Sequence, residues 1–337
     1  MAKLFKVSQS KVKVWRRCKQ EYHYKYVEGL RRKRIKRPFR FGNIIHSMLE
    51  ADANGDDAFE KLDELAQKDK KVFIKEKELY GDIIGDSRTI MQHYFRFWEK
   101  TPLNFSRRGT QCAEHEFELE IAKGIVAKGK LDAVAKTNNK LHWLVEHKTF
   151  KRLPGEDHRW RNLQSAVYLR MVKMLGWWKN LDGVCWDYVK SKPPTVPQLL
   201  KSGKLSTKSI DTLPDVVLKT IRDNKLRESD YKEFIKTAED NQKNYFFRTF
   251  TPVQERVVDA VFQGFVDTAK EMSQYHGTKK DKNIDRHCET CDYEAICRAE
   301  LTGSDFKFVK EREYYYEDEK PKGTVDEPDE DEEDSSE

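Results

Sequence analysis

The chain of 337 residues carries 64 basic and 58 acidic residues, which gives a formal net charge of +6. A chain of this length can bury a substantial core, as one large domain with insertions or as two lobes. It contains no apolar run long enough to span a membrane and begins with charged and polar residues. These features exclude a membrane-spanning protein and a signal peptide, so the sequence predicts a soluble, cytoplasmic protein.

The charges are distributed unevenly along the chain. Residues 311–337 hold 14 acidic and 3 basic residues, which leaves 61 basic and 44 acidic residues in residues 1–310. A basic body suits a polyanion such as nucleic acid, although a basic face can equally be a merely solvated surface. The acidic end is predicted to be a disordered tail that is solvated, occupies a basic channel or recruits a basic partner.

The first hundred residues are predicted to be mostly helical. A helix stripe runs through residues 8–28, with apolar side chains three or four positions apart at Val12, Trp15, Cys18, Tyr22 and Tyr26. The basic run from Arg31 to Arg37 precedes a second helix through FGNIIHSMLEA, and residues 56–100 continue as helix.

Strand-like segments follow. CAEHEFELEIA, GIVAKGKLDAVA, KLHWLVEHKTF and GVCWDYVK each have the composition and alternation of a strand. A helix over residues 157–175 separates the third segment from the fourth. Residues 198–250 are predicted to be a polar, mostly helical insertion, and residues 252–275 form a helix that leads to a cysteine-rich end.

Residues 129–150 contain two apolar runs around a polar turn. On a strand, Glu146 and Lys148 project from the same face because they are two positions apart. Asp132 joins them only if paired positions in the hairpin sum to 278, which requires an odd loop such as residues 138–140 or a compensating bulge. Two converging carboxylates offer oxygen ligands to Mg²⁺ or Mn²⁺, and the lysine can orient a water or stabilise phosphate charge. The alternative is a surface hairpin with a cross-strand ion pair.

This stretch resembles the PD-(D/E)XK nucleases, and in particular their RecB-like branch. In that branch an Asp opens one strand and Asp/Glu-x-Lys lies on the next, with Gly-x3-His on an upstream helix and Gln-x3-Tyr on a downstream helix. Here GNIIHSMLE supplies Gly42 and His46, and QSAVY supplies Gln164 and Tyr168, in the same order. Each helical motif alone has a structural alternative, either a histidine satisfied by its surroundings or a polar-edged helix face.

The resemblance implies roles for these residues. The implied ligands of Mg²⁺ or Mn²⁺ are His46, Asp132, Glu146 and the main-chain carbonyl of His147. Lys148 becomes the catalytic lysine, acting with Asp132 and Glu146. Gln164 and Tyr168 would hold the DNA strand near the metal. Glu116 is a weaker candidate for an added acidic contact, with Glu114 as its rival on the same face and a solvated strand edge as the alternative for both.

Six cysteines supply a second motif. Cys288, Cys291 and Cys297 lie in CETCDYEAIC, and such short spacing in an intracellular protein favours a metal over disulfides. The chain also resembles RecB-like members in which one N-terminal and three C-terminal cysteines bind a 4Fe-4S cluster, which makes Cys18 the fourth ligand. Four thiolates also suit structural Zn²⁺. Cys112 and Cys185 are predicted to be buried as small apolar residues.

The resemblance covers most of residues 8–300 and implies an α/β fold. The expected architecture is a restriction-endonuclease-like core, a central mixed sheet flanked by helices, with N- and C-terminal helices stapled by the four-cysteine cluster. A single nuclease domain spans residues 1–310 and precedes the acidic tail. Within it we expect an N-terminal helical region over residues 1–100, the sheet core 110–192, the helical insertion 198–250 and the C-terminal helix with the cysteines, 252–300.

The implied function is a metal-dependent exonuclease that hydrolyses phosphodiester bonds from DNA ends, on single strands, as in phage-encoded or CRISPR-adaptation nucleases of a bacterial cell or phage-infected host. Residues Arg31 to Arg37 and Trp160 are expected to contact the DNA backbone and bases, with surface and core roles as the alternatives. Alternative functions are a structure-specific or partner-directed endonuclease and a non-cleaving DNA-binding subunit, and the cluster could instead be a redox sensor. A homo-oligomer or a recombination or replication partner is compatible with the family.

Overall fold

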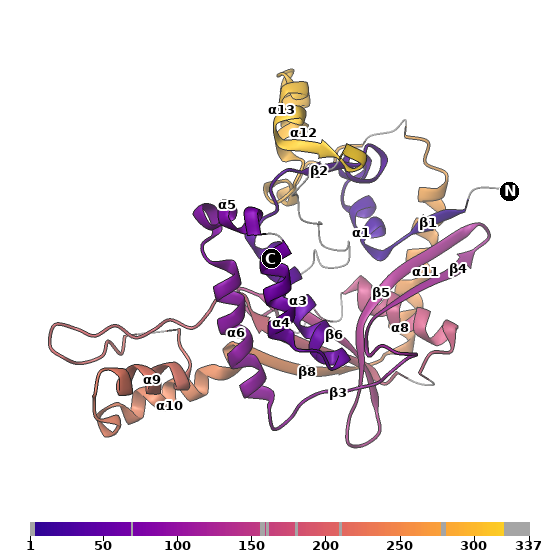
Figure 1. The fold of residues 1–337 in the computed structure, drawn as a ribbon. Coiled ribbons are helices and arrows are strands. Elements are labelled where there is room, and N and C mark those ends of the chain that lie inside the picture. The colour runs from indigo at the N-terminus through magenta and orange to yellow at the C-terminus, as the bar shows by residue number, and fades with distance from the viewer. Residues whose placement is uncertain are drawn as a thin grey trace.

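The computed structural model describes residues 4–68, 70–155, 159, 162–178, 181–208, 211–277 and 281–319. Within these residues a seven-stranded sheet forms the centre of the molecule (Figure 1). Its strands are β1 (Phe5–Val7), β3 (Asn104–Phe105), β4 (Ala113–Ala122), β5 (Ile125–Lys136), β6 (His142–Phe150), β7 (Gly183–Lys190) and β8 (Phe246–Pro252).

The sheet is mixed, as the resemblance implied. Its main path is β1-β5-β6-β7-β8, with β3 and β4 both paired to β5. The pairs β1 with β5 and β6 with β7 are parallel, and the remaining pairs are antiparallel. The parallel β6–β7 pair needs a crossover connection, which contains helix α8 (Leu163–Leu175).

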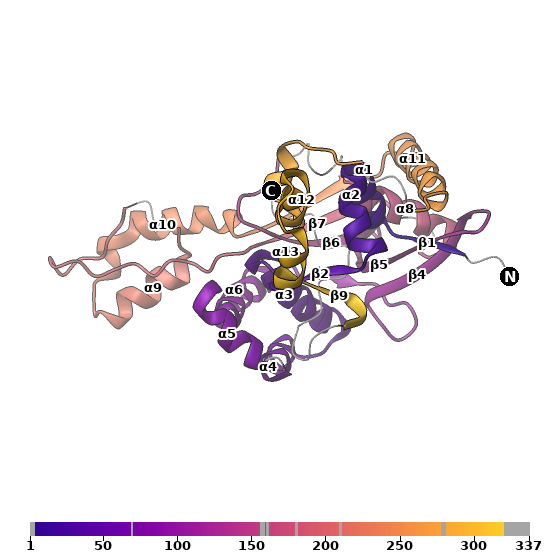
Figure 2. The same ribbon diagram turned by 90° about the horizontal axis from the view of Figure 1, so that it is seen from above.

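Helices cover both faces of this sheet (Figure 2). On one face, α1 (Gln9–Arg17), α8 and α11 (Glu255–Ser273) share the largest apolar core with β4, β5, β6 and β7. On the other face, α3 (Arg37–Asn54), α4 (Ala58–Lys68) and α6 (Ile83–Trp98) form a second core with the ends of β7 and β8. Helix α5 (Lys70–Tyr80) contacts α4 and α6. The sheet is therefore buried from both sides over its centre.

The segment expected to be a helical insertion over residues 198–250 requires a correction. It contains α9 (Pro214–Asp223) and α10 (Lys232–Asn241), but its end forms strand β8, which pairs with β7 from Gly183↔Pro252 to Val189↔Phe246. The run FFRTF has the aromatic and β-branched composition of a strand. Its partner strand, β7, lies more than fifty residues earlier in the chain. Pairing with this distant strand decides the conformation of the segment, and a local sequence pattern carries no information about such pairing.

A segment near residue 30 and the C-terminal segment lie side by side in both views (Figures 1 and 2), and the labels β2 and β9 mark them in Figure 2. Strand β2 (Leu30–Arg32) pairs antiparallel with β9 (Tyr314–Tyr316), and the hydroxyl of Tyr293 donates to the carbonyl of Leu30 at 2.8 Å. Around this pair lie the π-helical turn His23–Val27 and the helices α2 (Lys19–Tyr22), α12 (Glu294–Thr302) and α13 (Phe306–Glu313).

This junction corrects one expectation and bears on a second. Residues 311–319 were expected to belong to a disordered tail, yet they form the end of α13, strand β9 and a 3-10 turn. In the basic run from Arg31 to Arg37, which was expected to contact DNA, Arg31 is buried and pairs with Glu317 and Lys36 pairs with Asp292, whereas Lys33 and Arg34 are exposed. The acidic end therefore neutralises some of this basic run. Trp160 and residues 320–337 lie outside the described residues.

Among the described helices, none has both the length and the apolar composition required to cross a membrane.

Candidate active site

The hairpin of β5 and β6 has the register that brings Asp132 opposite Glu146. The paired positions run from Ala133↔Val145 to Lys136↔His142, and every pair sums to 278. The odd loop at residues 138–140 is confirmed, because the N–H of Thr137 donates to the carbonyl of Leu141 at 2.9 Å across its base. The parity condition derived from the sequence is therefore met by the loop, without a bulge.

Strands β5 and β6 separate just where Asp132 lies. The edge of β5 that faces β6 pairs with β1 at residues 125–127 and with β6 at residues 133–136, and no described strand occupies the interval. At the end of the β6 ladder, the main-chain N–H of His147 donates to Asp132 Oδ2 at 2.8 Å. The carboxylate of Asp132 thus takes the place of the main-chain carbonyl that would accept this hydrogen bond in a continuous sheet. This hydrogen bond holds Asp132 at the fork between the two strands.

Helix α3 brings His46 to the same fork. A Cβ atom on Gly42 would lie 3.5 Å from Thr149 Oγ1, so the helix backbone passes close to β6 at this point. His46 follows one turn later on the same helix face. Its Nδ1 lies 4.0 Å from Asp132 Oδ2, and its ring stands edge-on to that of His147 with centroids 6.2 Å apart. The Gly-x3-His spacing therefore sets both the approach of the helix and the place of the imidazole.

Glu146 and Lys148 form a buried charge pair on the α8 side of β6. Glu146 is 0% exposed, and Lys148 Nζ lies 3.3 Å from Glu146 Oε2. Lys148 also donates to Gln164 Oε1 at 3.1 Å. Gln164, in the first turn of α8, therefore fixes the position of the ammonium between an amide oxygen and a carboxylate. Burial of both charges strengthens their attraction, because solvent screening is weak there.

Tyr168 lies in the core. Its side chain is 1% exposed and its ring meets that of Phe117 edge to face at 5.3 Å. Gly129 makes room for this contact, because a Cβ atom there would lie 2.6 Å from Phe117 Cζ and 2.8 Å from Tyr168 Cε1. The resemblance implied that Gln164 and Tyr168 hold a DNA strand. Both side chains are buried here, with Gln164 3% and Tyr168 1% exposed, and Tyr168 packs in the core, so their contact with a DNA strand stays a prediction.

A buried polar network lies behind His147, on the other face of the sheet. Asp187 of β7 is 0% exposed and pairs in register with His147 and with Arg248 of β8. Its carboxylate lies 3.0 Å from His147 Nδ1 and accepts from Arg248 Nε at 3.1 Å and from the hydroxyl of Tyr94. Burial raises the pKa of Asp187, but Arg248 and His147 outweigh it and lower that pKa to about 2. Asp187 is therefore ionised at neutral pH.

Sequence reasoning missed this network, although one signal for it was present. Asp187 is the single charged residue inside the otherwise apolar run GVCWDYV. A charge in a fully buried strand requires a partner. The partners come from α6, β6 and β8, and β8 was not expected to be a strand.

The two acidic candidates on β4 differ in exposure and in their partners on β5. Glu116 is exposed and pairs across the strands with Lys130. Glu114 falls between the pairs Ala113↔Ala133 and His115↔Leu131, which places it opposite Asp132, and its φ is +57°. Burial raises the pKa of Glu114 to about 7, with a further contribution from the charge of Asp132. Of the two β4 carboxylates, Glu114 is therefore the one that lies opposite Asp132 in the strand register.

Comparison with known proteins agrees with this geometry. The family model of the PD-(D/E)XK nuclease superfamily matches residues 6–298. The chain belongs to the PD-(D/E)XK nuclease superfamily. The match spans β1 through Arg298 on α12, and membership indicates a nucleic-acid-cleaving function.

The other two comparisons add little. No curated protein matches the chain. A solved structure titled "Crystal structure of SSO0001" is 13% identical, with 87% of this chain and 86% of that chain covered and a TM-score of 0.33.

Nucleases of the PD-(D/E)XK superfamily usually use Mg²⁺ or Mn²⁺. The donors present fit such an ion by their chemistry, because Asp132 and Glu146 supply carboxylate oxygens and His46 an imidazole nitrogen. Across the described ranges, no group of three or more His, Cys, Asp or Glu side chains is arranged to hold a metal ion. Lys148 stands beside Glu146, where its ammonium provides the local positive charge.

The cysteines expected to form a cluster in this PD-(D/E)XK chain come from both ends. The N–H of Gln20 donates to the carbonyl of Asp281, and the amide of Asn283 donates to the carbonyl of Arg17, which brings Cys18 towards the C-terminal segment. Burial raises the pKa of Cys297, and the charges of Cys18 and Cys288 act on it in the same direction. Among the residues that the structure describes, these cysteines are not arranged as a metal site. As predicted, Cys112 and Cys185 are buried.

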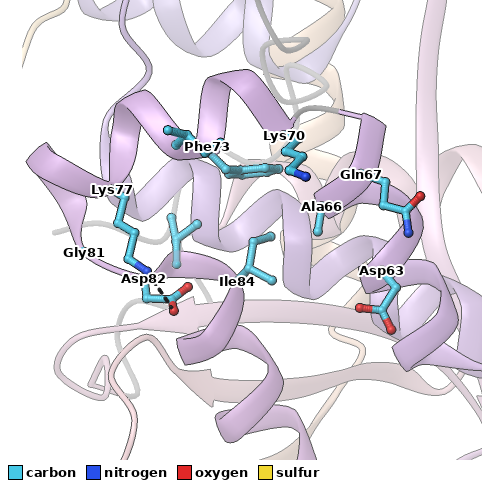
Figure 3. A pocket seen from close by; sticks show the side chains of 11 residues that line it. Asp63, Ala66, Gln67, Lys70, Phe73, Lys77, Gly81, Asp82 and Ile84 are labelled. Carbon is cyan, nitrogen blue, oxygen red and sulfur yellow. Dashed lines mark ion pairs between the residues drawn. The ribbon is translucent and has the colours of Figure 1, made fainter.

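A separate open pocket of about 650 Å³ lies among α4, α5 and α6 (Figure 3). Asp63 and Asp82 line it together with Lys70, Lys77 and several apolar side chains, and Lys77 Nζ lies 3.6 Å from Asp82 Oδ2. None of the residues expected to act in nuclease chemistry lines this pocket.

Proposed function

We propose that the chain is a metal-dependent deoxyribonuclease that removes nucleotides from DNA ends, acting on single strands. The observation that supports the proposal is the fork between β5 and β6, where Asp132 lies 4.0 Å from His46 and accepts from the N–H of His147, the residue between Glu146 and Lys148 of the buried pair. The motifs come from α3, β5, β6 and α8, in the order of the RecB-like branch. We therefore place the chain in that branch, with a phage or CRISPR-adaptation role as the corresponding setting.

Each residue has a separate task in hydrolysis. His46, Asp132, Glu146 and the carbonyl of His147 would hold Mg²⁺ or Mn²⁺, which when bound supplies Lewis-acid activation of water and phosphate. The N–H of His147 keeps Asp132 oriented at the fork. The Lys148 ammonium, fixed by Gln164, stabilises the negative charge that develops on the attacked phosphate.

The reaction breaks one bond and forms one. The oxygen of water attacks phosphorus in line, the bond from phosphorus to the 3′ oxygen breaks, and the leaving oxygen gains a proton. The products carry a 5′ phosphate and a 3′ hydroxyl. A non-cleaving subunit is disfavoured, because His46, Asp132, Glu146 and Lys148, the residues that this chemistry requires, are all present in the sequence.

We also propose that Cys18, Cys288, Cys291 and Cys297 bind a 4Fe-4S cluster, with Zn²⁺ as the competing occupant of four thiolates. The hydrogen bonds from Gln20 and Asn283 support this proposal because they hold the two cysteine-bearing segments against each other. Such a cluster would close a loop of more than two hundred residues and reinforce the β2–β9 junction.

The proposal is tested with anaerobically purified wild type and Lys148→Ala, using end-labelled single-stranded DNA and Mn²⁺. We expect wild type to remove nucleotides from one end and Lys148→Ala to leave the strand intact, which would also give the polarity. Internal fragments from closed circular single strands would instead indicate an endonuclease. Binding without cleavage by both proteins would indicate a non-cleaving subunit or an enzyme that needs a partner.

A further inference from the structure

Residues 192–208 and 211–245, between β7 and β8, form a folded projection that we call the arm. It contains α9, the 3-10 turn Glu228–Tyr231, α10 and the 3-10 turn Gln242–Asn244, and it extends away from the body in both views (Figures 1 and 2). It has an apolar core of its own, formed by Leu205, Val217, Ile221, Tyr231, Phe234 and Ala238. The arm is therefore a small structured unit and not an irregular loop.

The arm begins and ends beside the strand that carries the site. The N–H of Ser191 donates to the carbonyl of Phe150, two residues beyond Lys148 on β6, at 2.8 Å. The N–H of Lys190 donates to the carbonyl of Tyr245 at 2.9 Å, which closes the base of the arm. Arg37 of α3 also donates to the carbonyl of Ser191 at 3.3 Å. The base of the arm is therefore hydrogen-bonded to the end of β6 and to α3.

The segment before α9 contains a short hairpin, residues 199–205, which forms the part of the arm furthest from the body in Figure 1. Leu199 bridges to Leu205, and the N–H of Leu200 donates to the carbonyl of Lys204 at 2.8 Å. Gly203 at the turn has a φ of +77°, a conformation that favours glycine. Leu199 is 50% exposed and Leu200 48%, so a structured turn presents two large apolar side chains to solvent.

This hairpin lies in a stretch of exclusively positive charge. No Asp or Glu occurs in residues 188–210, which contain five lysines. Lys190 pairs with Asp211 at the base of the arm, and Lys201 and Lys204 flank the turn with exposed side chains. Exposed apolar residues between lysines, with no acidic residue nearby in sequence, match a polyanion that also offers apolar surface. Double-stranded DNA has these properties, since phosphates border grooves lined by sugars and base edges.

We propose that the tip of the arm binds the DNA duplex next to the strand end that enters the active site. Lys201 and Lys204 contact phosphates, and Leu199 and Leu200 pack against sugars and base edges in the groove. This inference rests on the proposed function and adds the substrate class to it. The preferred substrate is a duplex with a single-stranded end, held by the arm at its double-stranded portion and by the fork at its single strand.

The test compares wild type with Lys201→Ala/Lys204→Ala and with Leu199→Ser/Leu200→Ser. Binding to a duplex with a short single-stranded end is measured in EDTA over a range of salt concentrations. The control is Lys123→Ala/Lys307→Ala, which removes the same charge from the β4–β5 turn and from α13, outside the arm. Melting temperatures establish that each variant is folded. We expect all of them to fold, because the substituted side chains are exposed.

Loss of two phosphate contacts should reduce the slope of log K against log salt by about 1.8 for the tailed duplex, since each contact contributes about 0.9. The leucine variant should weaken duplex binding without changing the slope. Both should digest a short single strand at the wild-type rate, as should the control.

Unchanged duplex affinity and an unchanged slope of log K against log salt in both arm variants would overturn the inference. This outcome is expected if the tip of the arm docks a protein and not DNA. If wild type digests short single strands while the arm variants bind duplex normally, only the arm assignment fails. If wild type neither binds nor digests any DNA, the proposed function fails with it.

Discussion

Asp187 and His147 form a buried hydrogen bond of 3.0 Å behind the strand fork, and the N–H of that same His147 holds Asp132 on the other side. The imidazole of His147 is thus fixed from one face of the sheet while its peptide group orients a carboxylate at the site. Arg248 and Tyr94 hold Asp187 in turn. We infer that Asp187 is a positioning residue for Asp132.

Substitution of Asp187 by Asn should therefore weaken metal binding. We expect Asp187→Asn to bind Mn²⁺ about 10 to 100 times more weakly, the range found when residues that orient metal ligands are replaced. The measurement is a titration of Mn²⁺ followed by electron paramagnetic resonance. Asp215→Asn is the control, because it removes an aspartate paired with His93 and Arg96 away from the fork. Equal Mn²⁺ affinity in wild type and Asp187→Asn would contradict the positioning role.

The same aspartate should contribute stability that depends on pH. Its pKa is lowered to about 2 from 3.8 in the folded chain. Because the pKa of Asp187 is lower in the folded chain than in the unfolded chain, the ionised carboxylate stabilises the folded state when the pH is above the unfolded pKa. This stability is lost as the pH falls from about 4 to about 2. The contribution at neutral pH is about 2 kcal/mol. The difference in unfolding free energy between wild type and Asp187→Asn, measured with urea, should shrink over this range. A difference that stays constant with pH would exclude this linkage.

Removal of Lys148 should destabilise the chain as well as abolish cleavage. Lys148→Met leaves the fully buried carboxylate of Glu146 without the ammonium 3.3 Å away, and breaking a buried pair in this way costs about 3–5 kcal/mol. The loss should be largest in EDTA and partly reversed by Mn²⁺. The double variant Glu146→Gln/Lys148→Met should be more stable than Lys148→Met and equally inactive. A fully stable Lys148→Met protein in EDTA would show that the pair is not buried in solution.

The contact of Tyr168 with Phe117 should depend on Gly129. Gly129→Ala places a methyl group 2.6 Å from Phe117 Cζ, and such overpacking costs about 1–3 kcal/mol of unfolding free energy. Phe117→Leu in the same chain should recover some of this loss. The control is Gly155→Ala, where an added Cβ meets no atom within 4 Å. Equal melting temperatures for the two alanine variants would refute the packing role of this glycine.

Cys18 should bind iron together with the C-terminal cysteines. We expect Cys18→Ala to lose iron and sulfide and to melt at a lower temperature, because a link between the chain ends is removed. Cys112→Ala, at a buried cysteine outside the motif, is the control for the loss of a thiol. Zinc without iron in wild type would favour the tetrahedral alternative. Unchanged metal content and melting temperature in Cys18→Ala would refute a ligand role.

The sequence alone was enough to state the condition under which Asp132 lies opposite Glu146, and the structure showed that the condition is met. Strand alternation and the parity of a hairpin loop are local properties, so the condition that paired positions sum to 278 could be stated before any fold was known, and the register meets it. The spacing of Gly42 and His46 likewise depends only on the turn of one helix.

Only the tertiary structure decided which partners the buried charged residues have, because those partners lie on segments far apart in the chain. Asp187 obtains Arg248 only once β8 pairs with β7, and Lys36 pairs with Asp292 only once the chain ends meet. Glu114, and not Glu116, lies opposite Asp132 because of the register between β4 and β5, which pairs Glu116 with Lys130. Sequence patterns report which face of an element a residue occupies, whereas the partner on that face is set by long-range packing.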